Sequence, residues 1–382
     1  MNIRLPLALT VPVGIVLVAA GAVGGYSLAG RAQDLGTHPT AAVDRAALEQ
    51  LLTQREIIPT GQTQRFELTV SETRWELLPG VATDAVTFNG SVPGPTIRVT
   101  EGDTVEVAVT NRLTVPTSVH WHGLHVPNSQ DGVAGVTQEA IAPDATFTYR
   151  FTAPHAGTFM YHAHGPNSRE QIDRGLYAPL IIDPAAGDAV KADREAILVI
   201  GNWMVGDQMG AMGAMSMDYS YFTINGKSFP ATEDIEVREG ELLRVRFINP
   251  SQTVHPMHLH GMDMAVIAKD GEALAQPQRL NTLDIAPGDT YDVVVLADNP
   301  GTWLLHCHDL HHASNAGKEP GGLIVPVNVL PVGAASPAPS TLATPSASPA
   351  PPDTTTAEPE GHTMAPGMTQ MPGMSDMPGM TH

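Results

Sequence analysis

The segments VTEGDTVEVAVTNRL (99–113) and VREGELLRVRFINP (237–250) decide the fold, because apolar and polar residues alternate along both of them. Such alternation is the pattern of a half-buried β-strand, and the Glu-Gly pair in each segment marks a turn. The same alternation recurs between Gly, Pro and Asn turns from about residue 62 to residue 332, without a long helical pattern. The sequence therefore predicts an all-β protein.

The two segments resemble each other, and so do HAGTFMYHAHG (155–165) and NPGTWLLHCHD (299–309). Similarity at matching places indicates that one β unit has been duplicated. Many short strands in a unit of this size are typical of a β-sandwich. We therefore expect two β-sandwich domains, over residues 62–190 and 191–332.

The two ends of the chain differ in composition from the β units. Residues 1–30 are a basic start followed by an apolar run, which predicts a signal peptide or an uncleaved membrane anchor. Either interpretation places the rest of the chain outside the cytoplasm. Residues 31–61 are expected to be a polar spacer with a short amphipathic helix within 41–57. Residues 333–382 are expected to be a disordered Pro/Ser/Thr linker with a Met-rich tail.

Composition excludes several classes of protein. The 382 residues hold 20 Lys and Arg against 40 Asp and Glu, and this net charge of −20 would repel nucleic acids and anionic membrane surfaces. Only 16% of the residues are charged and 42% are hydrophobic, so the chain is not an acidic disordered protein. Its single cysteine excludes an intramolecular disulfide.

Four histidine clusters carry the chemistry. Each contains two histidines separated by one residue, and positions i and i+2 of a strand share a face. One such pair is more often structural than metal-binding, but four pairs at matching places of a duplicated unit point to a metal centre. Imidazole is a ligand for Cu, Zn, Fe and Ni. The pairs are His120 and His122, His162 and His164, His258 and His260, and His306 and His308.

The cysteine narrows the choice of metal. Cys307 lies between His306 and His308, so on a strand its sulfur must point to the opposite face and serve a second site. His255 and His312 remain to complete that site, and one thiolate with two imidazoles is the blue-copper pattern. Zinc fits poorly, since a structural zinc site would use more cysteines or one closed set of four ligands.

With these motifs, the chain strongly resembles the multicopper oxidases, the laccase-like family built from cupredoxin domains. The resemblance covers about residues 62–330 and includes HWHGLH, QDGVAGVTQ, GTFMYHAHG, HPMHLHG and HCHDLHH. It implies two cupredoxin-like Greek-key β-sandwiches and four copper ions per functional unit. It further implies these ligands: His255, Cys307 and His312 for type 1 copper, His120 and His258 for type 2, and His122, His162, His164, His260, His306 and His308 for the type 3 pair.

Two features set this chain apart within the resemblance. Only about 90 residues separate His164 from His255, which resembles the two-domain multicopper oxidases that assemble as homotrimers with trinuclear clusters between subunits. A Met or Leu is usual at the axial type 1 position a few residues after the last His, but the segment ASNAGKEPGGL has Gly317 five residues after His312, and no Met occurs between His312 and the Met-rich tail. Asp131 matches an acidic residue that could deliver protons to the trinuclear site, although an Asp-Gly turn is the alternative explanation.

The function implied is oxidation of a phenolic or organic donor, or of Cu(I), one electron at a time, coupled to four-electron reduction of O2 to water. A copper nitrite reductase is the first alternative, but it would carry its cysteine at position 163, which is Ala. A second alternative is a copper-tolerance protein that binds Cu(I) through the Met-rich tail. The Met run 204–217 is either a Cu(I) or substrate patch or an apolar loop, and His125 and His311 are expected to lie beside the site or at the surface.

Overall fold

The protein is represented by a computed structural model that describes residues 44–53, 56–205 and 218–334. The expected leader, the Met-rich tail and most of the Met run lie outside these residues. The described residues fall into two units, one that contains residues 44–53 and one that begins after residue 55. In the first unit, helix α1 (Arg45–Leu52) is capped by Asp44, whose carboxylate accepts the Ala46 N–H at 3.0 Å. Among the described residues, no helix is long and apolar enough to cross a membrane.

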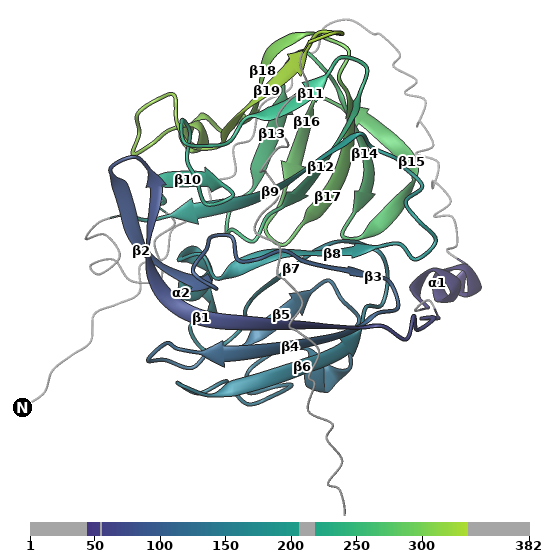
Figure 1. The fold of residues 1–382 in the computed structure, drawn as a ribbon, viewed down its shortest axis with the longest axis vertical. Coiled ribbons are helices and arrows are strands. Elements are labelled where there is room, and N and C mark those ends of the chain that lie inside the picture. Colours follow the sequence, from purple (N-terminus) through teal and green to yellow (C-terminus); the bar gives the residue numbers. More distant parts are fainter. Residues whose placement is uncertain (1–43, 54–55, 206–217, 335–382) are drawn as a thin grey trace, which may run out of the picture. The chain divides into compact units, whose positions relative to one another are not determined.

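The second unit contains two β-sandwiches, which confirms the all-β prediction (Figure 1). The first sandwich has one sheet of order β2-β1-β4-β6 and one of order β3-β8-β7-β5. Its elements are β1 (Thr63–Leu78), β2 (Val81–Phe88), β3 (Ile97–Thr100), β4 (Thr104–Asn111), β5 (Val119–His122), η1 (Asn128–Gln130), β6 (Thr146–Thr152), β7 (Gly157–Ala163), α2 (Ser168–Asp173) and β8 (Tyr177–Asp183).

The second sandwich repeats this plan with more strands. Its sheets have the orders β10-β9-β12-β17-β14-β15 and β11-β19-β18-β13-β16. Its elements are β9 (Arg194–Trp203), β10 (Tyr221–Ile224), β11 (Ile235–Arg238), β12 (Leu242–Ile248), β13 (His255–Leu259), β14 (Met264–Lys269), β15 (Glu272–Leu280), β16 (Thr282–Ile285), β17 (Thr290–Leu296), β18 (Gly301–Cys307), η3 (Leu310–Ala313) and β19 (Ile324–Leu330).

Duplicated sequence has produced duplicated topology. The first strand of each sandwich pairs in parallel with the strand that carries the repeated motif, β1 with β4 and β9 with β12. In β4 the alternation works as expected, because Val105, Val107 and Val109 are fully buried while the residues between them are only partly covered. Burial of such side chains from both sheets supplies the main stabilising term of each sandwich.

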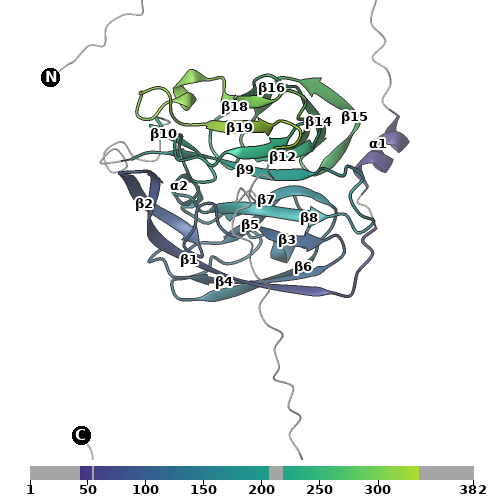
Figure 2. The ribbon, with the colours of Figure 1, turned by 45° about the horizontal axis from the view of Figure 1, so that its top comes forward.

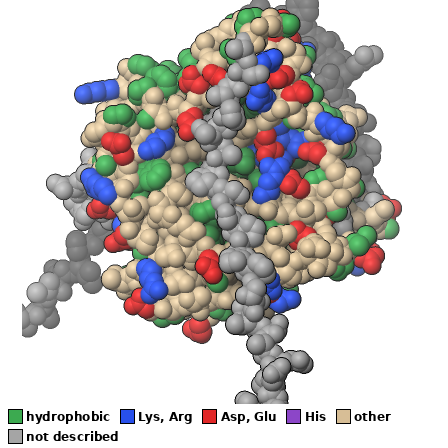
Figure 3. Space-filling model, viewed as in Figure 1, with side chains coloured by type: hydrophobic (Ala, Val, Ile, Leu, Met, Phe, Trp, Pro, Cys, Tyr) green, Lys and Arg blue, Asp and Glu red, His purple; other side chains and the backbone are tan. Residues whose placement is uncertain are grey.

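The two sandwiches meet through one sheet of each (Figures 1 and 2). Strand β7 contacts β12 and β17, and β8 contacts β9. At this junction the Arg246 guanidinium, on β12, donates to Asp292 at 2.8 Å and to the Thr158 hydroxyl at 2.7 Å, and Thr158 in turn donates to Asp292. The partners come from both sandwiches, so this buried network fixes how one sandwich lies on the other. Elsewhere, acidic and basic side chains are interspersed over the face shown in Figure 3.

Candidate metal centre

The first histidine cluster, here called the first half-site, consists of His120, His122, His162 and His164. Along β5, Val119 and Trp121 are fully buried in the sandwich core. His120 and His122 alternate with them and therefore lie on the other face of the strand. The antiparallel register of β5 and β7 then places His120 opposite His162. The His164 ring lies with its centroid 5.3 Å from that of His120.

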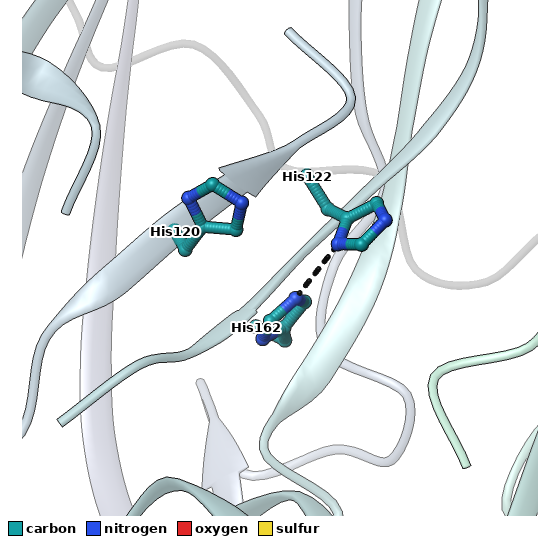
Figure 4. Close-up of side chains that lie close together, drawn as sticks. All are labelled: His120, His122 and His162. Carbon is teal, nitrogen blue, oxygen red and sulfur yellow. Dashed lines mark hydrogen bonds between the residues drawn. The ribbon is translucent and has the colours of Figure 1, made fainter. Parts of the chain in front are cut away.

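The backbone orients these rings. His120 Nδ1 lies 2.8 Å from the Asp131 carbonyl, and His162 Nδ1 lies 2.9 Å from the Ala163 carbonyl. Each carbonyl accepts the Nδ1 proton and leaves Nε2 as the free ligand atom, which is the usual arrangement behind a metal-binding histidine. His122 instead presents Nδ1, 3.3 Å from His162 Nε2 (Figure 4). One ligand atom from each of the three rings lies within 4.8 Å of the others, so they can share one ion.

The second half-site consists of His258, His260, His306 and His308. Strands β13 and β18 pair with His258 opposite His306. The Asn281 carbonyl holds His258 Nδ1 at 2.8 Å and the Cys307 carbonyl holds His306 Nδ1 at 2.9 Å, so these rings also present Nε2. Nε2 of His260 and Nε2 of His306 are 2.9 Å apart.

The thiolate site lies on the opposite face of the same strands. Cys307 is fully buried, and its Sγ is 4.0 Å from His255 Nδ1 and 3.6 Å from His312 Nδ1. A metal bound to sulfur and nitrogen in trigonal geometry would separate these atoms by about 3.8 Å. The Ser251 and Thr253 hydroxyls each lie 3.0 Å from His255 Nε2 and fix that ring. Donor chemistry and spacing therefore fit a His2Cys copper site.

Burial prepares the ligands for a metal. It lowers the pKa of His162 and that of His255 to about 3, so both rings are neutral at pH 7. Burial raises the pKa of the Cys307 thiol to about 12. Since a metal takes the thiolate, filling this site at neutral pH must release the thiol proton.

The remaining predicted residues lie around these sites. Asp131 Oδ1 is 3.4 Å from His120 Nδ1, which puts the carboxylate beside the first half-site. His125 lies instead beside His155, with ring centroids 5.5 Å apart. His311 Nε2 is 3.2 Å from the Tyr219 carbonyl, and the His311 ring centroid is 5.9 Å from that of His312.

Within one chain the two half-sites do not come together. The histidines of the second half-site point away from the core of their sandwich, whereas the sheet that contacts the first sandwich lies on the other side of that core. Among the described residues, the groups of ligand atoms close enough to share an ion are His120 with His122 and His162, and His255 with Cys307 and His312. Neither group combines histidines of both half-sites.

Several residues that shape the sites have no signal of their own in the sequence. Ser251 and Thr253 precede His255 in a turn and resemble ordinary turn residues. Gly288, in the turn between β16 and β17, lies beside His122, since an added Cβ would be 3.4 Å from the ring. These contacts join the site to distant parts of the chain, so only the fold reveals them.

Comparison with known proteins agrees with this geometry. Two family models, both described as multicopper oxidase, match residues 54–187 and 206–317. The crystal structure of a blue copper oxidase from Nitrosomonas europaea is 38% identical, with a TM-score of 0.66 over 70% of this chain and 86% of that chain. This chain belongs to the multicopper oxidase family.

Other relatives differ in length and in what they are named for. A copper resistance protein A homolog of Pseudomonas syringae is 32% identical over 60% of this chain and 47% of its own length. The matched part of this chain thus spans about half the length of these curated copper resistance relatives. A copper nitrite reductase from Nitrosomonas europaea is 28% identical, with a TM-score of 0.64 over 74% of this chain and 98% of that chain.

Proposed function

We propose that the protein is an oxidase that couples one-electron oxidation of a phenolic or organic donor, or of Cu(I), to four-electron reduction of O2 to water. The observation that carries this proposal is the position of Cys307. Its sulfur faces His255 and His312 in the core, while its chain neighbours His306 and His308 face outward. Electrons entering at the thiolate site therefore have a path of two residues of backbone to the histidine face.

The proposed ligand roles follow the family pattern. Bound copper would accept electrons singly at the thiolate site and reduce O2 at a trinuclear cluster, giving four ions per functional unit. The residues fit these roles because ring nitrogens lie close together within each half-site. Backbone carbonyls hold the rear nitrogens of four of these rings, and two hydroxyls hold that of His255. Type 1 takes His255, Cys307 and His312, type 2 takes His120 and His258, and type 3 takes His122, His162, His164, His260, His306 and His308.

We propose further that the trinuclear cluster forms between subunits of a homotrimer. Each half-site supplies four histidines, and the two halves of one chain face different directions. A ring in which the first half-site of one subunit meets the second half-site of the next would complete every cluster. Head-to-tail contacts of this kind close into rings when the rotation permits.

Asp131 is the proposed proton donor for O2 reduction. Its Oδ1 is 3.4 Å from His120 Nδ1. Its side chain is 30% exposed, so the carboxylate can exchange protons with water. The backbone of the same residue also holds the ring. One residue thus combines positioning of a ligand with proton supply.

Two alternatives have weaker support. The nitrite reductase reading is disfavoured because position 163 is Ala and the one cysteine lies in the second sandwich. A copper-tolerance role through the Met-rich tail is consistent with several relatives being copper resistance proteins, and it would add to the oxidase activity rather than replace it. Both the tail and the leader that suggests a location outside the cytoplasm fall beyond the described residues.

Oxygen uptake by the copper-loaded protein tests the activity. We expect uptake with a phenol or with Cu(I), whichever is the donor, and its loss in Cys307→Ser. His125→Ala is the matched control, because that histidine lies outside the proposed ligand set and should leave uptake unchanged. Uptake that survives Cys307→Ser would reject the thiolate site as the entry point for electrons.

Mixing variants tests the shared cluster. A chain with His162→Ala lacks the first half-site, and a chain with His306→Ala lacks the second. Trimers assembled from both chains contain some intact clusters only if each cluster lies between subunits, so activity should return on co-assembly. If the mixture stays as inactive as its components, the cluster is built within one chain.

A further inference from the structure

A carboxylate lies against the outer nitrogen of His312. Asp309 Oδ2 is 3.6 Å from His312 Nε2, while Nδ1 of the same ring faces the Cys307 sulfur. The other carboxylate oxygen of Asp309 accepts the His311 backbone N–H at 3.1 Å and thereby caps the helix η3. The cap holds the carboxylate in place, so its charge has a fixed position beside the ligand ring.

This carboxylate is also the more accessible of the two groups. The Asp309 side chain is 49% exposed, whereas the His312 side chain is 9% exposed. Two apolar side chains close in sequence are exposed as well: Leu310, which follows Asp309 and is 57% exposed, and Val254, which precedes His255 and is 47% exposed. A molecule approaching the outer nitrogen of His312 therefore meets the negative charge of Asp309.

We propose that Asp309 selects the electron donor by charge, favouring an apolar aromatic donor that carries a positive charge over an anionic one. The inference rests on the proposed oxidase function, since it names the donor class for the same electron-entry site. A donor gives up one electron to the copper held there and leaves with one more unit of positive charge. The carboxylate stabilises that added charge, and it repels a donor that arrives as an anion.

The size of the effect follows from Coulomb's law in a solvent-exposed setting. A unit charge on a donor about 4 to 5 Å from the carboxylate should change its rate constant by about fivefold in water. Removing the carboxylate charge should slow a cation by that factor and speed an anion by the same factor. The ratio of the two rate constants should thus fall by roughly twenty-five-fold, and added salt should shrink the difference.

The variant Asp309→Asn separates charge from structure, because Asn caps a helix about as well as Asp. Three ferrocene derivatives serve as donors with one redox core: a trimethylammonium cation, a neutral methanol and a carboxylate anion. Bleaching of the blue band is followed without O2 at pH 7 and low ionic strength, and the cation-to-anion ratio cancels any change in the potential of the copper. That potential and the melting temperature are measured separately.

Glu236→Gln is the matched control. It removes the same charge at another place on the sheet that carries Cys307. Glu236 on β11 is in register with Asn328 on β19, and Asn328 is in register with Thr302 on β18. Thr302 is five residues before Cys307 along β18, so the charge of Glu236 lies away from the thiolate site. The inference predicts a large fall in the ratio for Asp309→Asn and almost none for Glu236→Gln. Asp309→Ser, which also keeps a capping side chain, repeats the test if Asp309→Asn does not fold.

The outcomes separate this inference from the proposed function. An unchanged ratio in a folded, blue Asp309→Asn protein overturns the inference and leaves the oxidase proposal standing. An equal fall in Glu236→Gln also overturns it, because net charge would then explain the preference. A wild-type protein that forms no blue band with copper would overturn both.

Discussion

The Asp173 carboxyl should make the stability of the protein fall as pH rises. Its side chain, at the end of α2, is only 8% exposed, and burial raises its pKa from an ordinary value of 3.8 to about 6. Tyr219 donates to Asp173 Oδ2 at 3.1 Å and Arg169 lies 3.7 Å from the same oxygen, but these contacts do not offset the lost hydration. The raised pKa means that the folded protein favours the neutral carboxyl over the carboxylate. The stability that comes from keeping Asp173 neutral is therefore present at low pH and is lost as the pH rises through 6.

The magnitude follows from the shift in proton affinity. Each tenfold change in that affinity is worth about 1.4 kcal/mol, so ionising Asp173 in the folded protein costs about 3 kcal/mol relative to the unfolded chain. About half of this cost develops between pH 5 and pH 8, which is a range open to experiment. Asp173→Asn removes the charge but keeps an oxygen that can accept the Tyr219 hydroxyl.

Denaturant unfolding of both proteins between pH 5 and pH 8 measures the effect. The difference in free energy of unfolding, Asp173→Asn minus wild type, should rise with pH by about 1 to 2 kcal/mol, since other titrating groups cancel. Glu170→Gln is the control, because Glu170 lies on the same helix but is 61% exposed and pairs with Arg174 at the surface. A difference that stays constant with pH would show that the pKa of Asp173 is not raised and would refute the reasoning.

Three other substitutions test the metal site and the junction. Cys307→Ser should abolish the intense blue absorption and the narrow type 1 signal in electron paramagnetic resonance, because the thiolate is the ligand that produces them, and a blue variant would contradict the assignment. Arg246→Met should cost about 3 to 5 kcal/mol in unfolding experiments, since it leaves the buried Asp292 carboxylate unpaired, whereas Arg74→Met in an exposed ion pair should cost less than about 1 kcal/mol. Gly271→Ala should lower the melting temperature, because the residue has φ +78° and the added Cβ would lie 2.3 Å from the Phe159 ring; an unchanged melting temperature would mean that the junction yields easily.

Strands that bury one face were predictable from the sequence, and an exposed strand was not. Alternation identified β4 and β12 because their apolar side chains enter a core. Strand β15 has the sequence EALAQPQRL and is exposed along most of its length, so no apolar period marks it. It forms because β14 offers an edge with backbone hydrogen bonds, which is a tertiary effect. The short helix α2 is likewise too brief to leave a helical period.

The sequence could indicate which residues form the candidate metal sites, but not what surrounds them. The period of two in a strand was enough to place Cys307 on the face opposite His306, as the structure has it. The acceptors that orient the rings were not predictable, because they are backbone carbonyls and hydroxyls that any sequence offers in quantity. The junction of Arg246 with Asp292 and Thr158 was also hidden, since its partners lie 46 and 88 residues away in the chain.

The register of β13 and β18 ties both kinds of metal site to one structural feature. Met257 pairs with Cys307 on the core face, and His258 pairs with His306 on the outer face. A slip of one residue in either strand would exchange its faces, moving histidines into an apolar core and exposing the sulfur or the thioether. The apolar core of the sandwich opposes such a slip, because Met257 and Leu259 would lose their burial if β13 slipped and Leu305 would lose its burial if β18 slipped. The packing that stabilises the sandwich is therefore the same packing that holds the thiolate site and the second half-site on opposite faces of one sheet.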